Sequence, residues 1–309
     1  MSHYPTSTQK NKWSFDAPTL ALRRQESNNR AIENVRESYR LAVENGSHTN
    51  AQSATEPECG PPTVEEEGKI RKYYEKQLLA LCSSFQFPHK VHGTAMTYFK
   101  RFYVKNSLIE HHPKGIMLTC IYLACKCEEN YISMEQFARG ASQNLKEILN
   151  KELPVLHHLD FELITFTPYR SIIGLMLNLN DKLTEPIPEE TTAAVLASAQ
   201  AYVDELMLTD APLTFPPSQL ALVALSTACY QHQLPQAHAK LKDDAFKAAA
   251  EQSVALEENL ELLERMRCEG ATPINEEEVR NIDLKLKLWK TLTGDDKDRD
   301  KKRLKNNPT

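Results

Sequence analysis

Two charged residues interrupt stretches of sequence that are otherwise apolar, and they are the first candidates for a chemical role. Lys126 directly follows the apolar run Ile116–Cys125, and Glu152 falls on the helical stripe that contains Ile148 and Leu156. A charge on a partly buried face needs a partner, so each residue could pair with another charge or hold another molecule. Each could equally be an ordinary helix end, because the helix dipole favours a cation in the last turn and an acid in the first.

Metal binding and catalysis find little support among the cysteines and histidines. The chain has seven cysteines but no C-x-x-C pair, and Cys120, Cys125 and Cys127 are not spaced to gather three thiolates on one helix face. The adjacent histidine pairs 111–112 and 157–158 would project about 100° apart on a helix, which does not suit one metal ion. No glycine-rich phosphate loop, G-x-S-x-G or H-E-x-x-H motif occurs. We therefore expect a chain with no metal ion, no cofactor and no catalytic residues of its own.

The composition argues against several classes of protein. A chain of 309 residues suits two packed domains, and 41% of its residues are hydrophobic. Its net charge of −5 provides no general basic field for nucleic acid. No apolar run reaches the roughly 18 residues that a bilayer span needs, and residues 1–12 lack the apolar segment of a secretory signal. We expect no direct contact with nucleic acid or with a membrane.

The elements that position these residues are predicted to be helices throughout. Glycine is scarce, with 9 residues, and almost every periodic segment has apolar residues three and four apart. Thr63 and Glu66 match a capping box, and Pro113 and Pro168 suit the first turn of a helix. We expect helices over about 18–45, 91–106, 145–159 and 276–292, and others that begin near Thr63, Pro113, Ser133 and Pro168.

The predicted N-terminal helix is long and polar, and it carries only a thin apolar stripe. Its expected inward positions are Leu22, Ile32, Val35, Tyr39 and Val43. So narrow a stripe cannot hold a helix of this length by itself, and the helix should therefore lie across a folded body. We also expect a polar linker over 46–62 and a charged, disordered tail over 294–309.

Two further positions carry weaker expectations. Pro154 lacks the backbone N–H that a helix interior needs, so we expect the helix over 145–159 to break near Asn150. Lys100 and Arg101 form a basic pair that is typical of two solvated side chains, and neither is assigned a role.

The chain contains an internal repeat with an offset of 104 residues. Thr94–Lys126 aligns without a gap on Ser198–Tyr230. Each copy holds one nearly apolar helix, near residues 116–125 and 220–229, and a helix that is apolar all round must be surrounded. We predict a central helix ringed by about four others, built twice.

The two copies differ at the charged candidates. Lys126 corresponds to Tyr230, and at the same offset Glu152 corresponds to Leu256. The repeated fold unit can thus be built without either charge. The asymmetry makes Lys126 and Glu152 candidates for a role that only the first copy has, while the pattern alone still favours two ordinary helix ends.

Four segments resemble the cyclin box: "KYYEKQLLALCSSF" at 72–85, "GTAMTYFKRFY" at 93–103, "HHPKGIMLTCIYLACKCEE" at 111–129 and "LDFELITFTPYR" at 159–170. The resemblance extends over about 13–289 and is strongest to the cyclin H subfamily. It implies an all-α fold of two tandem five-helix cyclin-box repeats, flanked by a long N-terminal helix and a C-terminal helix. The expected divisions are an N-terminal extension over 1–63, cyclin boxes over 64–163 and 164–270, and a C-terminal helix and tail over 271–309.

The resemblance also implies a binding site for a kinase. In cyclins a lysine at the end of the third box helix and a glutamate on the fifth hold the kinase, and the matching residues here are Lys126 and Glu152. Such a pair would fasten loop backbone of a cyclin-dependent kinase, whose regulatory helix then takes its productive position. Leu123, Leu156 and Phe161 match positions that pack against that helix. In such an interface the apolar anchors supply affinity and the charges fix the register.

Partners and setting follow from the same resemblance. The chain is expected to activate a cyclin-dependent kinase that phosphorylates other cyclin-dependent kinases and the C-terminal domain of RNA polymerase II. Further expected partners are a RING-finger assembly subunit and the larger TFIIH complex, and the expected location is the nucleus. The basic segment 301–303 could serve nuclear import or be a solvated tail.

Other functions stay open as alternatives. Another transcriptional cyclin, of the cyclin C kind, would bind a different kinase. A cyclin-fold transcription factor that binds promoter DNA would use basic helices and a zinc ribbon, whereas this chain is acidic and has no C-x-x-C pair. An enzymatic activity of its own has no motif to support it.

Overall fold

The computed structural model describes residues 3–44 and 59–292. Within these ranges the chain forms helices and turns and no strand, which confirms the predicted all-α class. No helix in the described ranges is long and apolar enough to cross a bilayer. Most of the expected linker over 46–62, the side chain of Val43, the expected tail over 294–309 and the basic segment 301–303 lie outside the described residues.

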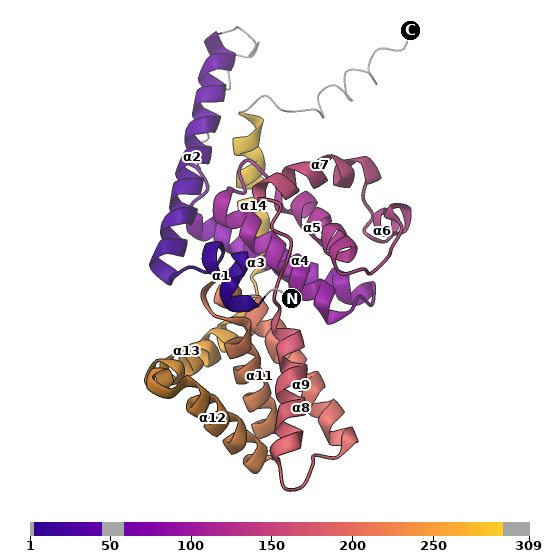
Figure 1. The fold of residues 1–309 in the computed structure, drawn as a ribbon. Coiled ribbons are helices and arrows are strands. Elements are labelled where there is room, and N and C mark those ends of the chain that lie inside the picture. The colour runs from indigo at the N-terminus through magenta and orange to yellow at the C-terminus, as the bar shows by residue number, and fades with distance from the viewer. Residues whose placement is uncertain (1–2, 45–58, 293–309) are drawn as a thin grey trace. The chain divides into compact units, whose positions relative to one another are not determined.

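Figure 1 shows the order of the helices, which fall into two compact units. The first unit comprises Met1–Ala17, Tyr74–Phe102 and Gly115–Pro273, and the second comprises Pro18–Tyr73, Tyr103–Lys114 and Ile274–Thr309. The helices are α1 (Thr8–Lys12), α2 (Ala17–Glu44), α3 (Val64–Ser84), α4 (His89–Lys105), α5 (Pro113–Cys127), α6 (Met134–Gly140), α7 (Leu145–His158), α8 (Pro168–Lys182), α9 (Glu189–Met207), α10 (Ala211–Thr214), α11 (Pro217–Gln231), α12 (Pro235–Ala249), α13 (Ser253–Ala271) and α14 (Glu276–Thr291).

Local sequence signals explain where several helices begin. The predicted capping box forms, because the Thr63 backbone N–H donates to Glu66 Oε2 at 2.8 Å and the Glu66 N–H donates to Thr63 Oγ1 at 3.2 Å. Ser133 caps α6 by accepting from the Gln136 N–H at 3.1 Å, as predicted. Asn144 caps α7 in the same manner. These bonds satisfy N–H groups that the first turn of a helix leaves without intrahelical partners.

The second copy of the repeat confirms the predicted central helix. Helix α11 contacts α8, α9, α12 and α13, which surround it in Figure 1. Helices α5 and α11 are both 15 residues long and both begin at a proline, 104 residues apart. Both are buried over most of their length, as expected for helices that are apolar all round.

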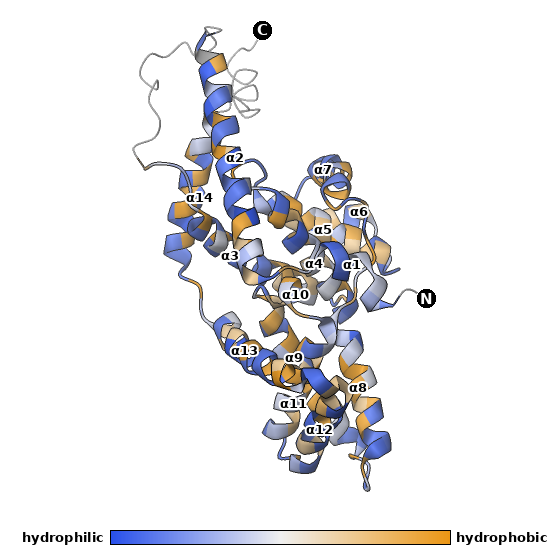
Figure 2. Cartoon of the chain, turned by 60° about the vertical axis from the view of Figure 1, so that its left-hand side comes forward, coloured by the Kyte–Doolittle hydropathy of each residue, from blue (hydrophilic) through white to orange (hydrophobic). Residues whose placement is uncertain are grey.

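The buried face of α2 matches the predicted stripe only in part. Val35 is buried as predicted, and Ile32 and Tyr39 are half-buried. Leu22 was expected to face inward but is 59% exposed, while Leu20 and Ala31, which were not predicted, are buried. Figure 2 shows that α2 is largely hydrophilic, so its few apolar residues do not by themselves identify the buried face of the helix. The true inward face includes polar Asn28, whose side chain donates to the Pro62 carbonyl at 3.0 Å within the second unit.

The predicted break near Asn150 is wrong. Helix α7 runs without interruption from Leu145 to His158, with Pro154 inside it. The cap at Asn144 starts the helix early, and the proline side chain is exposed to solvent. Helix geometry therefore persists despite the missing backbone bond at this position, at a local cost of about 3 kcal/mol.

The expectation that Lys100 and Arg101 are solvated is also wrong. Both side chains are fully buried on α4. Lys100 Nζ lies 2.7 Å from Glu75 Oε1 on α3, and both side chains are almost inaccessible. Arg101 Nη1 donates to the Glu162 carbonyl at 3.1 Å, and its guanidinium lies 5.3 Å from the centre of the Trp13 ring. Burial lowers the pKa of Arg101 to about 10, which leaves it charged at neutral pH.

Candidate functional site

The structure brings together the two charged residues singled out by the sequence. Lys126 Nζ, in the last turn of α5, lies 2.5 Å from Glu152 Oε1 on α7. The side chains are 45% and 20% exposed, so both charges stay open to solvent on one side. Lys126 Nζ also lies 4.6 Å from the centre of the Tyr122 ring, close enough for a cation–π contact. The pair is thus held in place by its own chain yet accessible to another molecule.

Helices α5 and α7 approach closely enough to set this geometry. The Thr119 hydroxyl on α5 donates to the Ile148 carbonyl on α7 at 3.4 Å. Gly115 lies under the aliphatic stem of Lys151, where an added Cβ would come within 2.9 Å of Lys151 Cε. The end of the Lys151 side chain is flexible and can move aside, so this glycine does not by itself set the approach of the two helices. The ion pair between Lys126 and Glu152 places the last turn of α5 against the middle of α7.

Several exposed or half-buried apolar side chains lie on α7 and just after it. Leu149 and Leu153 are 42% and 57% exposed, and Leu156 is half-buried. Phe161 and Ile164 follow the helix and are also exposed. Leu123 differs from the other predicted contact residues, because it is buried at 4% exposure and can only support the surface from below. We call Leu149, Leu153, Leu156, Phe161 and Ile164 the α7 apolar surface.

The backbone after α7 turns sharply to present Phe161. Asp160 and Phe161 have φ values of 54° and 56°, a left-handed conformation that costs non-glycine residues energy. The turn is closed by the Phe161 N–H, which donates to the Leu156 carbonyl at 3.0 Å. The His157 ring meets the Phe161 ring edge to face, with 5.1 Å between centroids. A strained turn held in this way fixes an exposed aromatic side chain in one place.

The N-terminal segment supports the same turn, and sequence reasoning missed it. Gln9 on α1 donates from Nε2 to the Phe166 carbonyl at 3.0 Å and accepts from the Phe166 N–H at 2.7 Å. The indole N–H of Trp13 donates to Glu162 Oε2 at 2.7 Å, and Lys12 forms an ion pair with the same carboxylate. One of only two tryptophans in the chain, placed in a polar segment, was the available signal.

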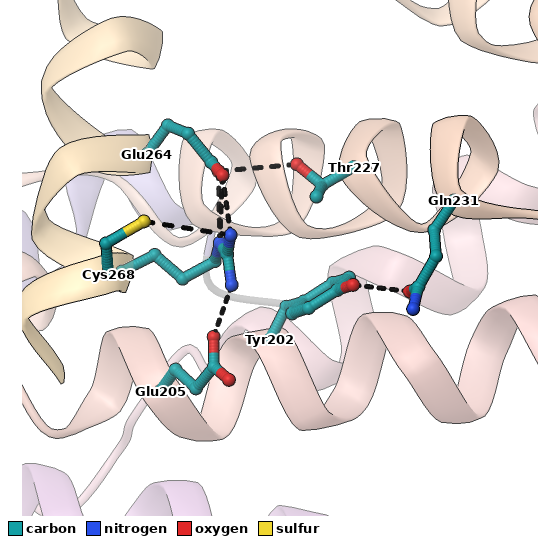
Figure 3. A network of polar contacts seen from close by, with 7 residues as sticks. Tyr202, Glu205, Thr227, Gln231, Glu264 and Cys268 are labelled. Atoms are coloured by element: carbon teal, nitrogen blue, oxygen red, sulfur yellow. Dashed lines mark hydrogen bonds and ion pairs between the residues drawn. The ribbon is translucent and has the colours of Figure 1, made fainter. Parts of the chain in front are cut away.

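The matching place in the second copy carries no ion pair. Tyr230 is 74% exposed, and Leu256 is buried. The charged network of the second copy lies elsewhere, around Arg267 on α13, between the carboxylates of Glu264 and Glu205 that are labelled in Figure 3. Arg267 pairs with Glu264 on its own helix and with Glu205 on α9, at 2.7 and 2.5 Å. These hydrogen bonds raise the pKa of Arg267 and tie α13 to α9, which is a structural task.

Comparison with protein families assigns both halves of the chain. Residues 42–164 match the cyclin N-terminal domain, and residues 167–268 match the cyclin C-terminal domain. Cyclin-H1-1 of Arabidopsis thaliana is 41% identical over 238 residues, which cover 74% of this chain and 71% of the relative.

Solved structures give the same answer. The chain resembles one in the CAK complex of Chaetomium thermophilum bound to ATP-γ-S, with a TM-score of 0.78 and 25% identity over 93% of this chain and 88% of that one. Its fold also resembles a chain of the yeast TFIIK complex of Kin28, Ccl1 and Tfb3, with a TM-score of 0.66 and 22% identity over 85% of this chain and 100% of that one. The chain therefore belongs to the cyclin family, as the two domain matches, the identity to Cyclin-H1-1 and the shared fold show together.

Proposed function

We propose that this chain is a cyclin H-like regulatory subunit that binds and activates a cyclin-dependent kinase through Lys126, Glu152 and the α7 apolar surface. The observation that carries the proposal is the solvent-accessible ion pair between Lys126 and Glu152, together with exposed leucines on the same helix as Glu152 and an exposed Phe161 after it. A surface pair contributes little to folding. Exposed apolar side chains next to fixed charges are typical of a protein interface.

The geometry suggests how the surface would act on a kinase. The ammonium group of Lys126 can donate to backbone carbonyls, and the carboxylate of Glu152 can accept from backbone N–H groups. Leu156 and Phe161 would pack on the regulatory helix of the kinase, with Leu123 beneath them. Held in this way, the helix would place the glutamate that pairs with the ATP-binding lysine of the kinase. The chain itself is a non-catalytic activator, so it needs only to bind.

The setting of the proposed function is transcription. The similar chains come from complexes named CAK and TFIIK, and the second of these contains Tfb3 as a third subunit. We propose a kinase that phosphorylates other cyclin-dependent kinases and the C-terminal domain of RNA polymerase II. The proposed further partners are a RING-finger assembly subunit and TFIIH, and the proposed location is the nucleus. The alternative of a cyclin C-like subunit is less well supported, because the relative named above at 41% identity is Cyclin-H1-1.

We also propose functional divisions along the chain. The first cyclin box, over 64–163, would contain the kinase-binding surface except Ile164, which directly follows it. The second box, over 164–270, and the extensions over 1–63 and 271–309 would support it or bind other subunits. The hydrogen bonds of Gln9 and Trp13 favour a supporting role for the N-terminal extension, because they hold the turn that presents Phe161.

A charge swap separates a kinase-binding role from a structural one. Lys126→Glu and Glu152→Lys should each leave the chain folded and lower kinase activation at least tenfold, a loss of about 1.4 kcal/mol or more in coupling. The double variant Lys126→Glu/Glu152→Lys restores an intramolecular ion pair with the charges exchanged. If the pair were only structural, the double variant would recover full activation.

We expect the double variant to stay inactive, because the exchanged charges face the wrong backbone groups of the kinase. Affinity should be measured by calorimetry with the purified kinase, and activation by phosphate transfer to a C-terminal-domain peptide. Lys182→Glu, which alters an exposed ion pair with Asp244 in the second copy, is the matched control and should activate normally. Wild-type activation by either single variant would contradict the proposal.

A further inference from the structure

Two histidines and an aspartate from distant parts of the sequence converge inside the first unit. His89 and His92 lie three residues apart in the first turns of α4, so their side chains share one face of the helix. Asp204 comes from α9. The nitrogen and oxygen atoms that these three side chains offer all lie within 4.8 Å of one another. His92 is buried, and the other two are half-buried.

The imidazoles of this cluster are poorly satisfied by the protein. Nδ1 of His89 and both ring nitrogens of His92 are buried without a hydrogen bond of good geometry, although the Phe87 backbone lies close to the His92 ring. Buried polar atoms nearly always have a partner, because leaving one unpaired costs about 1–3 kcal/mol. An ion pair between His89 and Asp204 would satisfy one nitrogen and would leave both nitrogens of His92 unpaired. These atoms would be satisfied by a metal cation, which can accept lone pairs from several side chains at once.

The Asp204 carboxylate is held by a second polar group. The Tyr169 hydroxyl donates a hydrogen bond to Asp204 Oδ1. Metal-binding carboxylates are commonly oriented in this way by a second hydrogen-bonding group.

Packing holds the same residues in register. The Tyr169 ring stacks on the His89 ring with 5.1 Å between centroids. A Cβ added at Gly93 on α4 would lie 2.7 Å from Thr167 Cγ2, so the glycine lets the start of α8 approach α4 closely. Tyr169 can therefore contact His89 and Asp204 together.

We propose that His89, His92 and Asp204 bind one Zn²⁺ ion, with Tyr169 as the residue that positions Asp204. Two imidazoles and one carboxylate are an established set of zinc ligands, with bonds of about 2.0–2.2 Å. Tetrahedral binding needs donor atoms roughly 3.3 Å apart, so rotations of the three side chains must close the gap from the observed spacing. The fourth position would hold water or a group of a partner.

The proposed ion would link the two repeats, because α4 belongs to the first and α9 to the second. It also departs from our expectation of a chain without metal. That expectation weighed the cysteines and the adjacent histidine pairs. The H-x-x-H spacing of His89 and His92 was not weighed, and Asp204 lies more than a hundred residues away in the sequence.

Metal analysis of the full chain, expressed without a histidine tag, tests the proposal. After equilibration with ZnSO₄ and gel filtration, the wild type should retain about one zinc ion per chain. Asp204→Asn keeps the side-chain shape and an acceptor for Tyr169, and it should reduce zinc affinity at least tenfold, as should His92→Gln. Tyr169→Phe should weaken binding by about 10–100-fold while leaving all three ligands in place. His3→Gln removes an exposed histidine and should bind zinc like the wild type.

Two readouts keep the test independent of how well the variants fold. Co²⁺ bound to the wild type should give the intense visible bands of a tetrahedral site. Zinc should raise the melting temperature of the wild type and leave that of Asp204→Asn unchanged. A wild-type chain that retains no zinc, or equal zinc binding by wild type and Asp204→Asn, would overturn the proposal. Neither outcome depends on kinase binding.

Discussion

At the scale of residues, two lysine–glutamate pairs in the first unit have opposite surroundings. Lys126 and Glu152 are partly exposed, whereas Lys100 and Glu75 are 1% and 3% exposed. An exposed pair is worth little to folding and is free to bind a partner molecule. A buried pair is part of the core, and breaking it leaves an uncompensated charge away from water. We therefore propose a role in recognition for the exposed pair, whereas the buried pair belongs to the core.

Lys100→Met should lower the free energy of unfolding by about 3–5 kcal/mol, because the Glu75 carboxylate would stay buried without the lysine charge. Urea unfolding followed by circular dichroism measures the change. The double variant Lys100→Met/Glu75→Leu removes both charges and should recover most of the loss. A double variant as unstable as the single one would show that the charges themselves are not responsible.

At the scale of elements, α7 carries the candidate site and contains an unfavourable residue. Its cap at Asn144 sets the register that brings Glu152 to Lys126. Pro154 lies two residues after Glu152 and removes one backbone hydrogen bond from the middle of the helix. The sequence was compatible with a break and with a continuous helix. The residue at which the helix begins decides whether Pro154 lies in its first turn or in its interior.

Pro154→Ala should stabilise the chain, by up to about 3 kcal/mol, because alanine restores the backbone bond and favours the helix. Thermal unfolding would show the gain as a higher midpoint. Ala138→Pro in the short helix α6 is the opposite substitution and should destabilise. No gain for Pro154→Ala would indicate that the helix already bends to accommodate the proline.

At the scale of the whole molecule, acid sensitivity should arise partly from ion pairs of the second unit. Burial by itself would raise the pKa of Glu66, but hydrogen bonds from Lys285 and Thr63 outweigh it and lower the pKa below 4.5. Burial would also raise the pKa of Asp283. Hydrogen bonds from Lys287 and His112 outweigh this effect, so the pKa of Asp283 is lowered as well. A carboxylate whose pKa is lower in the folded chain stabilises it above the unfolded pKa. That contribution is lost as the pH falls through the folded value.

Glu66→Gln and Asp283→Asn should therefore each cost about 1 kcal/mol at pH 7, and the cost should shrink as the pH falls through the folded pKa of each carboxylate. Urea midpoints of wild type and variants, measured between pH 7 and pH 3, should approach one another as the pH falls. Glu135→Gln, at an exposed position on α6, is the control and should match the wild type throughout. Variant deficits of the same size at pH 7 and pH 3 would assign the loss to packing instead of charge.

Much of the fold and part of the candidate site could be predicted from the sequence. Apolar spacing, caps and the offset of 104 residues predicted the helices, the duplicated bundle and the asymmetry at Lys126 and Glu152. These features depend on residues near one another in the chain, or on a pattern that occurs twice. Local rules of helix formation and burial are sufficient to read them.

Only the tertiary structure decided whether individual polar side chains are buried and which partners they have. Lys100 and Arg101 read as solvated because charge usually stays in water, yet Glu75 and the Glu162 backbone receive them in the core. The inward face of α2 and the convergence of His89, His92 and Asp204 were equally hidden. The free energy of a buried polar group depends on the partners that surround it in space. Those partners come from distant segments of the chain, and no local sequence pattern predicts which segments come together.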